Sequence, residues 1–387
     1  MKEIFSNPNF KLGVLGGGQL GKMMLQETRR YDIYTKVIDP AADAPSRLAS
    51  NEFVQGSLTD YNTVMEFGRG LDVLTIEIEH VNVDALEDLQ KQGVKVFPQP
   101  SALRIIQNKA DQKEFYQTKG LPTSKFFTFK NKAEMLEGLK DGNWKPPFVW
   151  KAATGGYDGF GVNIVKDAAQ IESLPDQAGL VEAFVPFEKE LAVIVARNEH
   201  GQTVTYPVVE MEFHPTANQV EYVLCPATVS PEAEEKARKL AVDAIEAFDL
   251  VGLLAVEMFL SKDGEVYINE VAPRTHNSGH LTIESNFTSQ FEQHVRAVTG
   301  MPLGSTELRL PAVMANLVGE TGYSGPVRYD GYENLLSMPG VYIHLYGKSS
   351  TRPFRKMGHV TVTNADRSEA RKAAEQAKSA IKVISRS

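Results

Sequence analysis

Two carboxylates face each other in a predicted β-hairpin in the second half of the chain. Two apolar, β-leaning runs flank Asp263-Gly264, a dipeptide that favours a two-residue hairpin turn. Counting outward from that turn places Glu257 opposite Glu270, where like charges destabilise a sheet, the more so among apolar neighbours. A cation between them resolves the repulsion, and oxygen-only ligands favour Mg²⁺, which also binds nucleotide phosphates. We therefore predict a Mg²⁺ site here, with Asn269 in reach; two acids on a solvated hairpin face are the alternative.

A glycine cluster over residues 155–161 forms a second candidate site. Four of these seven residues are glycine, and β-leaning runs lie on both sides. Glycine weakens a strand, so such a cluster indicates a hairpin loop with unusual dihedral angles or with a ligand close to its backbone. Bare N–H groups there can bind an anion, and Lys151 at the end of the incoming strand can add its charge to a phosphate site. A plain hairpin tip is the alternative.

Two further loops carry cations that could bind anions. Arg274 and His276 lie among small polar residues directly after the second carboxylate, and they indicate a site for a small anionic substrate. Nearer the C-terminus, a local basic cluster stands out in an acidic chain: Lys348, Arg352, Arg355 and Lys356. Guanidinium and ammonium groups next to a glycine suit a substrate phosphate. The alternatives are a structural loop in the first case and a solvated basic loop in the second.

A glycine motif near the N-terminus indicates another phosphate site. Gly16, Gly18 and Gly21 follow an apolar run and match G-x-G-x-x-G at the start of a predicted helix, and Asp39 ends the next predicted strand. The pattern suits a nicotinamide cofactor, another phosphate at a helix N-terminus, or a close strand–helix packing turn. Glu77 ends a later strand, where an open α/β sheet has its ligand crevice; a solvated strand end is the alternative.

Composition bounds the class of protein. The 387 residues predict two or three domains, and 42% hydrophobic with 23% charged residues is ordinary for a globular chain. A net charge of -8 without a basic block argues against nucleic-acid or acidic-membrane partners. The single Cys225 excludes an internal disulfide, and no run has the length of a signal or membrane segment. We expect a cytoplasmic protein that binds neither nucleic acid nor membranes.

The elements that must position these residues differ along the chain. A β-α-β-α-β pattern predicts a doubly wound parallel domain over residues 1–110. Residues 111–299 combine β-leaning runs, one of them a predicted strand over 204–213, with a long amphipathic helix over 231–249. Residues 300–387 add three predicted strands and an Ala-rich closing helix over 368–384. The expected fold class is α/β (α+β).

Together these stretches resemble the ATP-grasp ligases, and more narrowly the N5-carboxyaminoimidazole ribonucleotide synthase family. The resemblance extends from Gly16 to the final helix. It rests on six strings: 16–21, 75–80, Lys151 with 154–159, 182–185, 268–280 and 355–359. It implies an N-terminal Rossmann-like substrate domain (1–110), a central ATP-grasp nucleotide-binding domain (111–299) and a small β-rich C-terminal domain (300–387) that completes the substrate site.

The resemblance also implies residue roles. Mg²⁺ is held by Glu257 and Glu270, and the reacting centre is lined by Asp158, Arg274 and His276, with Asp158 as proton acceptor. The ribonucleotide is bound by Gln19, Glu77, Lys348, Arg355 and Lys356. ATP is bound, with a lid over 156–162, by Lys109, Lys151, Gly156, Tyr157, Asp158, Gly159, Phe160, Gly161, Val162, Glu182, Ala183, Phe184, Val185, Glu190, His214, Asn269 and Glu270.

The implied reaction belongs to purine biosynthesis. Bicarbonate attacks the ATP γ-phosphate to give carboxyphosphate, and 5-aminoimidazole ribonucleotide is then carboxylated on its exocyclic amine. The resemblance further implies a homodimer and a separate mutase that receives the product. Three alternatives remain: another ATP-grasp ligase, such as a formate-using purine ligase or an amino-acid ligase; a nicotinamide oxidoreductase; and a non-catalytic nucleotide sensor.

Overall fold

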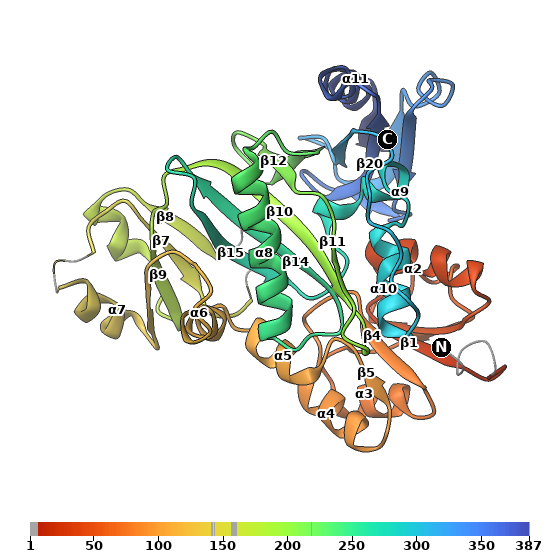
Figure 1. Cartoon of the computed structure of the whole chain (residues 1–387), viewed down its shortest axis with the longest axis horizontal. Coiled ribbons are helices and arrows are strands. Elements are labelled where there is room, and N and C mark those ends of the chain that lie inside the picture. The colour runs from red at the N-terminus through yellow and green to blue at the C-terminus, as the bar shows by residue number, and fades with distance from the viewer. Residues whose placement is uncertain (1–6, 141, 143, 156–160, 218, 387) are drawn as a thin grey trace.

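The computed structural model describes the chain except residues 1–6, 141, 143, 156–160, 218 and 387 (Figure 1). Five residues of the expected nucleotide lid therefore lie outside the described residues: Gly156, Tyr157, Asp158, Gly159 and Phe160. Within the described part, every helix is too short or too polar to span a bilayer.

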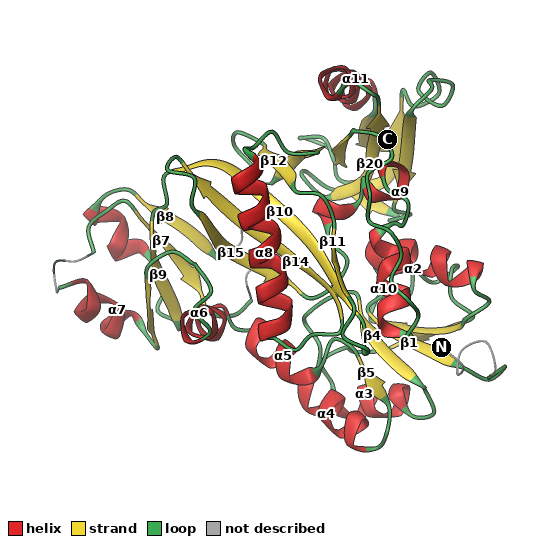
Figure 2. Cartoon of the chain, viewed as in Figure 1, coloured by secondary structure: helices red, strands yellow, loops and turns green. Residues whose placement is uncertain are grey.

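The first part of the chain forms a five-stranded parallel sheet with helices on both faces (Figure 2). The strands in spatial order are β3 (Glu52–Gln55), β2 (Tyr34–Asp39), β1 (Lys11–Leu15), β4 (Val73–Ile76) and β5 (Lys95–Val96). The helices are α2 (Gln19–Arg30) on one face and α3 (Tyr61–Gly68), α4 (Val83–Lys91) and α5 (Pro100–Ile106) on the other. This confirms the predicted doubly wound arrangement. Open α/β sheets of this kind bind ligands at the C-terminal ends of their strands, here those of β1 and β4.

One helix from much later in the chain completes this unit. Helix α10 (Gln290–Val298) packs beside α2, and its Phe291, Val295 and Val298 share a core with residues of β1 and α2. The segment that follows the predicted metal hairpin is therefore anchored to the N-terminal sheet. The N-terminal and central parts are joined by shared apolar packing as well as by the chain.

A second, four-stranded sheet carries the glycine cluster. Its order is β6 (Phe126–Phe129), β9 (Gly179–Ala183), β7 (Phe148–Ala152) and β8 (Val162–Val165). Strands β7 and β8 are antiparallel with Lys151 opposite Val162, which confirms the predicted strands on either side of the cluster. Around this sheet lie α6 (Lys109–Thr118), α7 (Lys132–Leu139) and η1 (Ala168–Ser173), and the lobe occupies one end of the molecule (Figure 1).

A nine-stranded antiparallel sheet forms the centre of the molecule. Its main path is β15 (Val266–Ala272), β14 (Gly252–Ser261), β10 (Phe187–Arg197), β12 (Val209–Phe213), β13 (Val220–Cys225), β16 (Ala312–Val318), β20 (Lys356–Thr363) and β18 (Val341–Leu345), with β11 (Thr203–Thr205) on β10. Strand β13 pairs with β16, so one sheet continues across residue 300. The division into 1–110, 111–299 and 300–387 stays a prediction.

Helices cover this large sheet in two places. Helix α8 (Pro231–Ala247) lies along β10 and β14 (Figure 2), with Ala237, Leu240 and Ile245 in the shared core. Helix α11 (Arg367–Ala380) covers β16 and β20. Two short helices follow the β14–β15 hairpin: η2 (Asn277–Gly279) and α9 (Thr282–Ser285). The C-terminal part also contains a small sheet of β19 (Ser350–Thr351), β17 (Gly325–Asp330) and β21 (Lys382–Ser385).

Two predicted boundaries were wrong for local reasons. The closing helix ends at Ala380 rather than residue 384, because residues 382–385 form β21 and pair with β17. The run predicted as one strand over 204–213 is two strands, β11 and β12, which pair with different parts of β10. Pro207 lies between them, where a proline cannot donate to a ladder.

Candidate active site

The β14–β15 hairpin pairs Glu257 with Glu270, as predicted, but by a different path. The turn is one residue longer than the predicted Asp263-Gly264 turn, because the N–H of Ser261 donates to the carbonyl of Glu265 at 2.9 Å. Gly264, with φ of +81°, supplies the left-handed residue that this longer turn needs. The register is therefore shifted by one residue near the turn, with Leu260 opposite Val266.

A β-bulge restores the predicted pairing. On β14, Glu257 and Met258 are consecutive, whereas their partners Glu270 and Ile268 are two apart, so Asn269 is the extra residue. Consecutive strand residues normally point to opposite faces, and a bulge changes this. Asn269 accepts a hydrogen bond from Lys151 Nζ at 3.0 Å, and Glu270 pairs with Lys109 Nζ at 2.5 Å. The bulge thus directs two neighbouring side chains toward lysines of one site.

The two opposed carboxylates have different acidities. Burial and the charge of Glu270 raise the pKa of Glu257 to about 7. Burial also acts to raise the pKa of Glu270, but the ammonium of Lys109 outweighs it and the pKa is lowered. Glu190 of β10 shares this acidic region, and burial together with Glu257 raises its pKa to about 7. Adding a cation here would relieve a repulsion that the fold leaves in place.

The donor set fits Mg²⁺. Two carboxylates from opposed strands, with the Asn269 amide oxygen on the same side, present oxygen ligands only. Among the described residues there is no group of three His, Cys, Asp or Glu side chains that could hold a metal. A site with few protein carboxylates is typical of Mg²⁺, which takes its other ligands from water and phosphate. Although protein atoms crowd around Glu270, its side chain keeps 44% of its surface exposed, so a ligand can reach it.

A buried charge network adjoins the hairpin. Lys151 Nζ lies 3.0 Å from Glu182 Oε1, and Lys113 Nζ lies 3.2 Å from Glu182 Oε2. Ser124 Oγ donates to the same Oε2 at 2.8 Å. Burial favours the neutral acid, but Lys151 and Lys113 outweigh it and lower the pKa of Glu182 to about 2. Lys113 is only 3% exposed, although lysines on helices are mostly solvated, so its sequence setting did not single it out.

The predicted anion loop lies against the carboxylate pair. His276 Nε2 is 3.2 Å from Glu257 Oε1, and Arg274 is 2.9 Å from Glu79 at the end of the N-terminal sheet. Gln290 of α10 holds the loop, since its Oε1 accepts from the His276 N–H at 2.9 Å and its Nε2 donates to the His276 carbonyl at 2.7 Å. His276 therefore reaches the Glu257/Glu270 pair, whereas Arg274 pairs with a carboxylate at the end of the N-terminal sheet.

The N-terminal glycine turn is filled by protein carboxylates, which argues against a dinucleotide pyrophosphate there. Glu77 is 9% exposed, and its Oε2 accepts from the N–H of Gly21 at 3.0 Å. Asp39 accepts from the N–H of Gly17 at 2.7 Å, so it binds the turn rather than presenting itself to a ribose. A Cβ on Gly18 would come within 2.8 Å of Glu77, so glycine is needed for this close approach. The nicotinamide alternative is therefore contradicted.

The predicted ribonucleotide residues come from two distant segments. Lys348 Nζ donates to the carbonyl of Lys356 at 2.7 Å, and Arg355 donates to the carbonyl and hydroxyl of Ser350 at 2.7 and 2.9 Å. Gln19 is the first residue of α2 in the N-terminal part of the chain. Sequence reasoning missed Lys22, which directly follows the glycine turn and donates to the carbonyl of Leu345 at 3.0 Å. This bond joins the turn to the basic cluster.

The expected adenine and ribose residues lie along β9, β10 and the end of β12. Ala183 ends β9 opposite Phe148, and Phe184 is 41% exposed in the segment that continues to Val185. His214 follows β12; its Nδ1 accepts from the N–H of Ala217 at 3.1 Å, and its ring packs against Phe354 at 5.8 Å. Their roles in nucleotide binding stay predictions.

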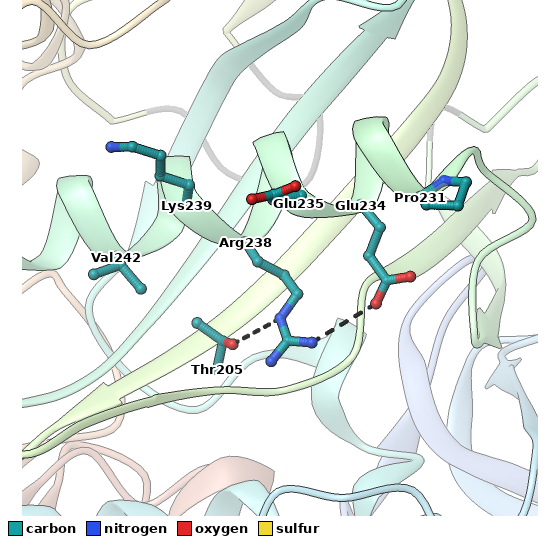
Figure 3. Close-up of a pocket in the computed structure, with 7 residues that line it drawn as sticks. All are labelled: Thr205, Pro231, Glu234, Glu235, Arg238, Lys239 and Val242. Carbon is teal, nitrogen blue, oxygen red and sulfur yellow. Dashed lines mark hydrogen bonds and ion pairs between the residues drawn. The ribbon is translucent and has the colours of Figure 1, made fainter.

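A surface pocket elsewhere is unrelated to this site. Figure 3 shows the residues that line it, which come from α8 and, with Thr205, from β11. Its volume is about 370 Å³. Its Arg238 donates to Thr205 at 3.0 Å and pairs with Glu234 at 3.8 Å. These are ordinary mutual contacts of an exposed helix, so we assign no chemistry to this pocket.

Comparison with known families gives three consecutive matches. Residues 10–107 match the ribonucleotide synthetase preATP-grasp domain, residues 114–291 the ATP-grasp domain, and residues 312–373 the phosphoribosylaminoimidazole carboxylase C-terminal domain. The order agrees with the parallel sheet, the hairpin-containing middle and the C-terminal strands described above.

Known proteins resemble the chain over nearly its whole length. The N5-carboxyaminoimidazole ribonucleotide synthetase of Thermotoga maritima is 42% identical, with a TM-score of 0.89, covering 97% of this chain and 100% of that one. The Aspergillus clavatus synthase, in complex with ADP and 5-aminoimidazole ribonucleotide, is 35% identical with a TM-score of 0.85, covering 96% and 98%. Phosphoribosylaminoimidazole carboxylase of Vigna aconitifolia is 40% identical over 92% of this chain, which spans 64% of that longer protein.

Proposed function

Because this chain belongs to the N5-carboxyaminoimidazole ribonucleotide synthase family of ATP-grasp proteins, we propose that it carboxylates 5-aminoimidazole ribonucleotide in purine biosynthesis. ATP and bicarbonate are consumed, and N5-carboxyaminoimidazole ribonucleotide, ADP and phosphate are released. One observation carries this proposal: the bulged hairpin sets the Glu257/Glu270 pair beside Lys109, Lys151 and His276. That arrangement suits a metal-bound polyphosphate next to a small anion.

The first step is a phosphoryl transfer. An oxygen of bicarbonate attacks the γ-phosphorus of ATP, the bond from that phosphorus to the bridging oxygen breaks, and ADP leaves with carboxyphosphate as the other product. Lys109 and Lys151 offset the charge of the phosphates. Glu257 and Glu270 would hold Mg²⁺, which neutralises charge on the phosphate oxygens when bound.

The second step forms the carbon–nitrogen bond. The exocyclic amine of the ribonucleotide attacks the carboxyl carbon of carboxyphosphate, and the bond from that carbon to the phosphate oxygen breaks, so phosphate leaves. The amine loses one proton, for which Asp158 is the proposed acceptor. Arg274 and His276 are proposed to hold the small anion, since His276 lies beside Glu257 and Gln290 fixes the loop that carries both residues. Exclusion of water matters because carboxyphosphate hydrolyses readily.

The phosphate of the ribonucleotide is proposed to bind Lys348, Arg355 and Lys356. Gln19 and Glu77 are proposed to contact the remainder of the ribonucleotide. The charge of Lys356 acts on Glu257, which supports a location of this cluster next to the metal pair. Residues 1–110 and 300–387 would then share the substrate, and residues 111–299 would bind the nucleotide. We further propose a cytoplasmic homodimer whose product is passed to a separate mutase.

A release assay for ADP with each substrate omitted in turn tests the function. We expect ADP release only when bicarbonate and 5-aminoimidazole ribonucleotide are both present. Formate in place of bicarbonate, or full activity without the ribonucleotide, would indicate a different ATP-grasp ligase. Nucleotide binding without any turnover would indicate a sensor.

A further inference from the structure

We propose that Lys113 is a positioning residue: it holds the Glu182 carboxylate so that Lys151 can turn to a nucleotide phosphate. The inference rests on the proposed function only in that a nucleotide phosphate binds at Lys151. Lys113 lies on α6, while Glu182 is on β9 and Lys151 on β7 of the four-stranded sheet (Figure 1). None of the roles proposed above involves Lys113.

Lys113 is fully engaged inside the protein. Its Nζ donates to Thr123 Oγ1 at 2.6 Å and Ser124 Oγ at 3.0 Å, and lies 3.2 Å from Glu182 Oε2. An ammonium has three N–H donors, and three acceptors surround this one. The side chain is 3% exposed, so it meets neither solvent nor a ligand directly. Its function must therefore act through the groups that it holds.

The two oxygens of Glu182 are held differently. Oε2 takes Lys113 and the hydroxyl of Ser124. Oε1 lies 3.0 Å from Lys151 Nζ but is buried without a hydrogen bond of good geometry. Lys151 makes its hydrogen bond to Asn269 instead, on the bulge beside the metal pair. Lys151 can thus turn to a phosphate while Glu182 keeps both hydrogen-bonding partners.

Without Lys113, Glu182 would lose the charged partner of its Oε2 and would draw on Lys151 instead. A buried carboxylate needs a charged partner, because leaving it unpaired is costly. Glu182 would then depend on Lys151, and a phosphate would have to compete for that ammonium. Affinity should fall for nucleotides that carry phosphate and should stay for adenosine, which has none. Burial lowers the pKa of Lys113 to about 8 against the charge of Glu182, and the neighbouring Lys151 and Lys109 add to the lowering.

The test compares ADP with adenosine binding by calorimetry in the whole protein. For Lys113→Met we expect ADP to bind on the order of tenfold more weakly, the usual effect of one charged hydrogen bond, and adenosine to change less than twofold. Lys119→Met, at the exposed end of the same helix, is the matched control and should change neither. In a Glu182→Gln background, Lys113→Met should no longer shift the ratio of the two affinities.

Equal losses for ADP and adenosine, or no loss, would overturn the inference. If Lys113→Met does not fold, the wild-type protein provides a second test. The ratio of ADP affinity to adenosine affinity should fall as pH rises through about 8, where Lys113 loses its charge. A ratio that stays constant from pH 7 to about 9.5 would overturn the inference. Neither measurement needs bicarbonate or ribonucleotide. A wild-type protein that binds ADP without carboxylating therefore refutes the proposed function alone.

Discussion

The carboxylates of Glu257 and Glu270 stand directly opposite each other on β14 and β15, yet they hold their protons with different strength. The pKa of Glu257 is raised to about 7 by burial and by Glu270, whereas Lys109, 2.5 Å from Glu270, keeps the pKa of Glu270 low despite burial. At neutral pH the pair therefore carries between one and two negative charges. A divalent cation would complete the ionisation and bind more tightly as pH rises.

Glu270→Gln should abolish most turnover with Mg-ATP while the fold remains. The amide keeps the shape and removes a charge that holds the metal, so we expect kcat to fall on the order of a hundredfold. ADP release over a Mg²⁺ titration measures this. Glu265→Gln changes a carboxylate in the same hairpin that pairs with Lys236 at the surface, and it should leave turnover unchanged. Full activity of Glu270→Gln at saturating Mg²⁺ would refute the metal assignment.

Glu257→Gln should stabilise the metal-free protein at alkaline pH. The folded pKa of about 7 lies above the unfolded value, so the stability that Glu257 contributes is present below about pH 4.5 and lost as pH rises through 7. The glutamine does not titrate. We expect the variant to gain up to about 3 kcal/mol over the wild type between pH 5 and pH 8. Urea unfolding with a chelator at pH 5 and at pH 8 measures the difference in unfolding free energy between variant and wild type. The same difference at both pH values would contradict the assigned pKa.

Arg355→Ala should raise the KM for the ribonucleotide about tenfold or more and leave the KM for ATP within twofold, because the proposed contact is to the substrate phosphate. Arg355 is partly buried and bonded to Ser350, whereas Arg352 in the same loop is exposed. Arg352→Ala is therefore the matched control. A joint rise of both KM values would instead assign the cluster to the nucleotide site or to the fold.

NAD and NADP should not stabilise the protein against heat, whereas ADP with Mg²⁺ should. The Glu77 carboxylate already accepts from the N-terminal turn, and a pyrophosphate would meet it with like charge. Thermal unfolding with each nucleotide is the measurement. As a second readout, Glu77→Ala should destabilise the fold by about 2 kcal/mol, because it leaves buried N–H groups without their acceptor. Stabilisation by NAD would reinstate the dinucleotide interpretation.

The sequence predicted the Glu257/Glu270 pair because local signals, strand patterns and an Asp-Gly turn, sufficed. The turn itself is longer than predicted, and the bulge at Asn269 compensates for the shift. Neither feature has a strong local signature, since a bulge is fixed by what its strand packs against. The predicted pairing is therefore correct because the longer turn shifts the register by one residue and the bulge shifts it back by one.

The burial of side chains by residues distant in sequence could not be predicted from the sequence. Lys113 has a sequence setting similar to that of the exposed Lys119, and only packing against Glu182 distinguishes it. Glu77 fills a turn 56 positions earlier, so the glycine motif looked open to a cofactor. Parallel strands β1 and β4 and the flanking helices were predictable from periodicity alone, whereas the joining of β13 to β16 across residue 300 was not.

The large sheet has a mechanical consequence. Glu257 on β14 and Lys356 on β20 are five strands apart along the sheet, roughly 24 Å if it were flat, and salt screens exposed charges beyond about 10 Å. The loop after β15 nevertheless reaches both regions, since His276 lies 3.2 Å from Glu257 and the next residue, Asn277, exchanges hydrogen bonds with Asn316 on β16. The sheet must therefore curl. The spacing between the ATP side and the ribonucleotide side is then set by curvature. Substitutions that flatten the middle strands would separate the reactants without touching either one.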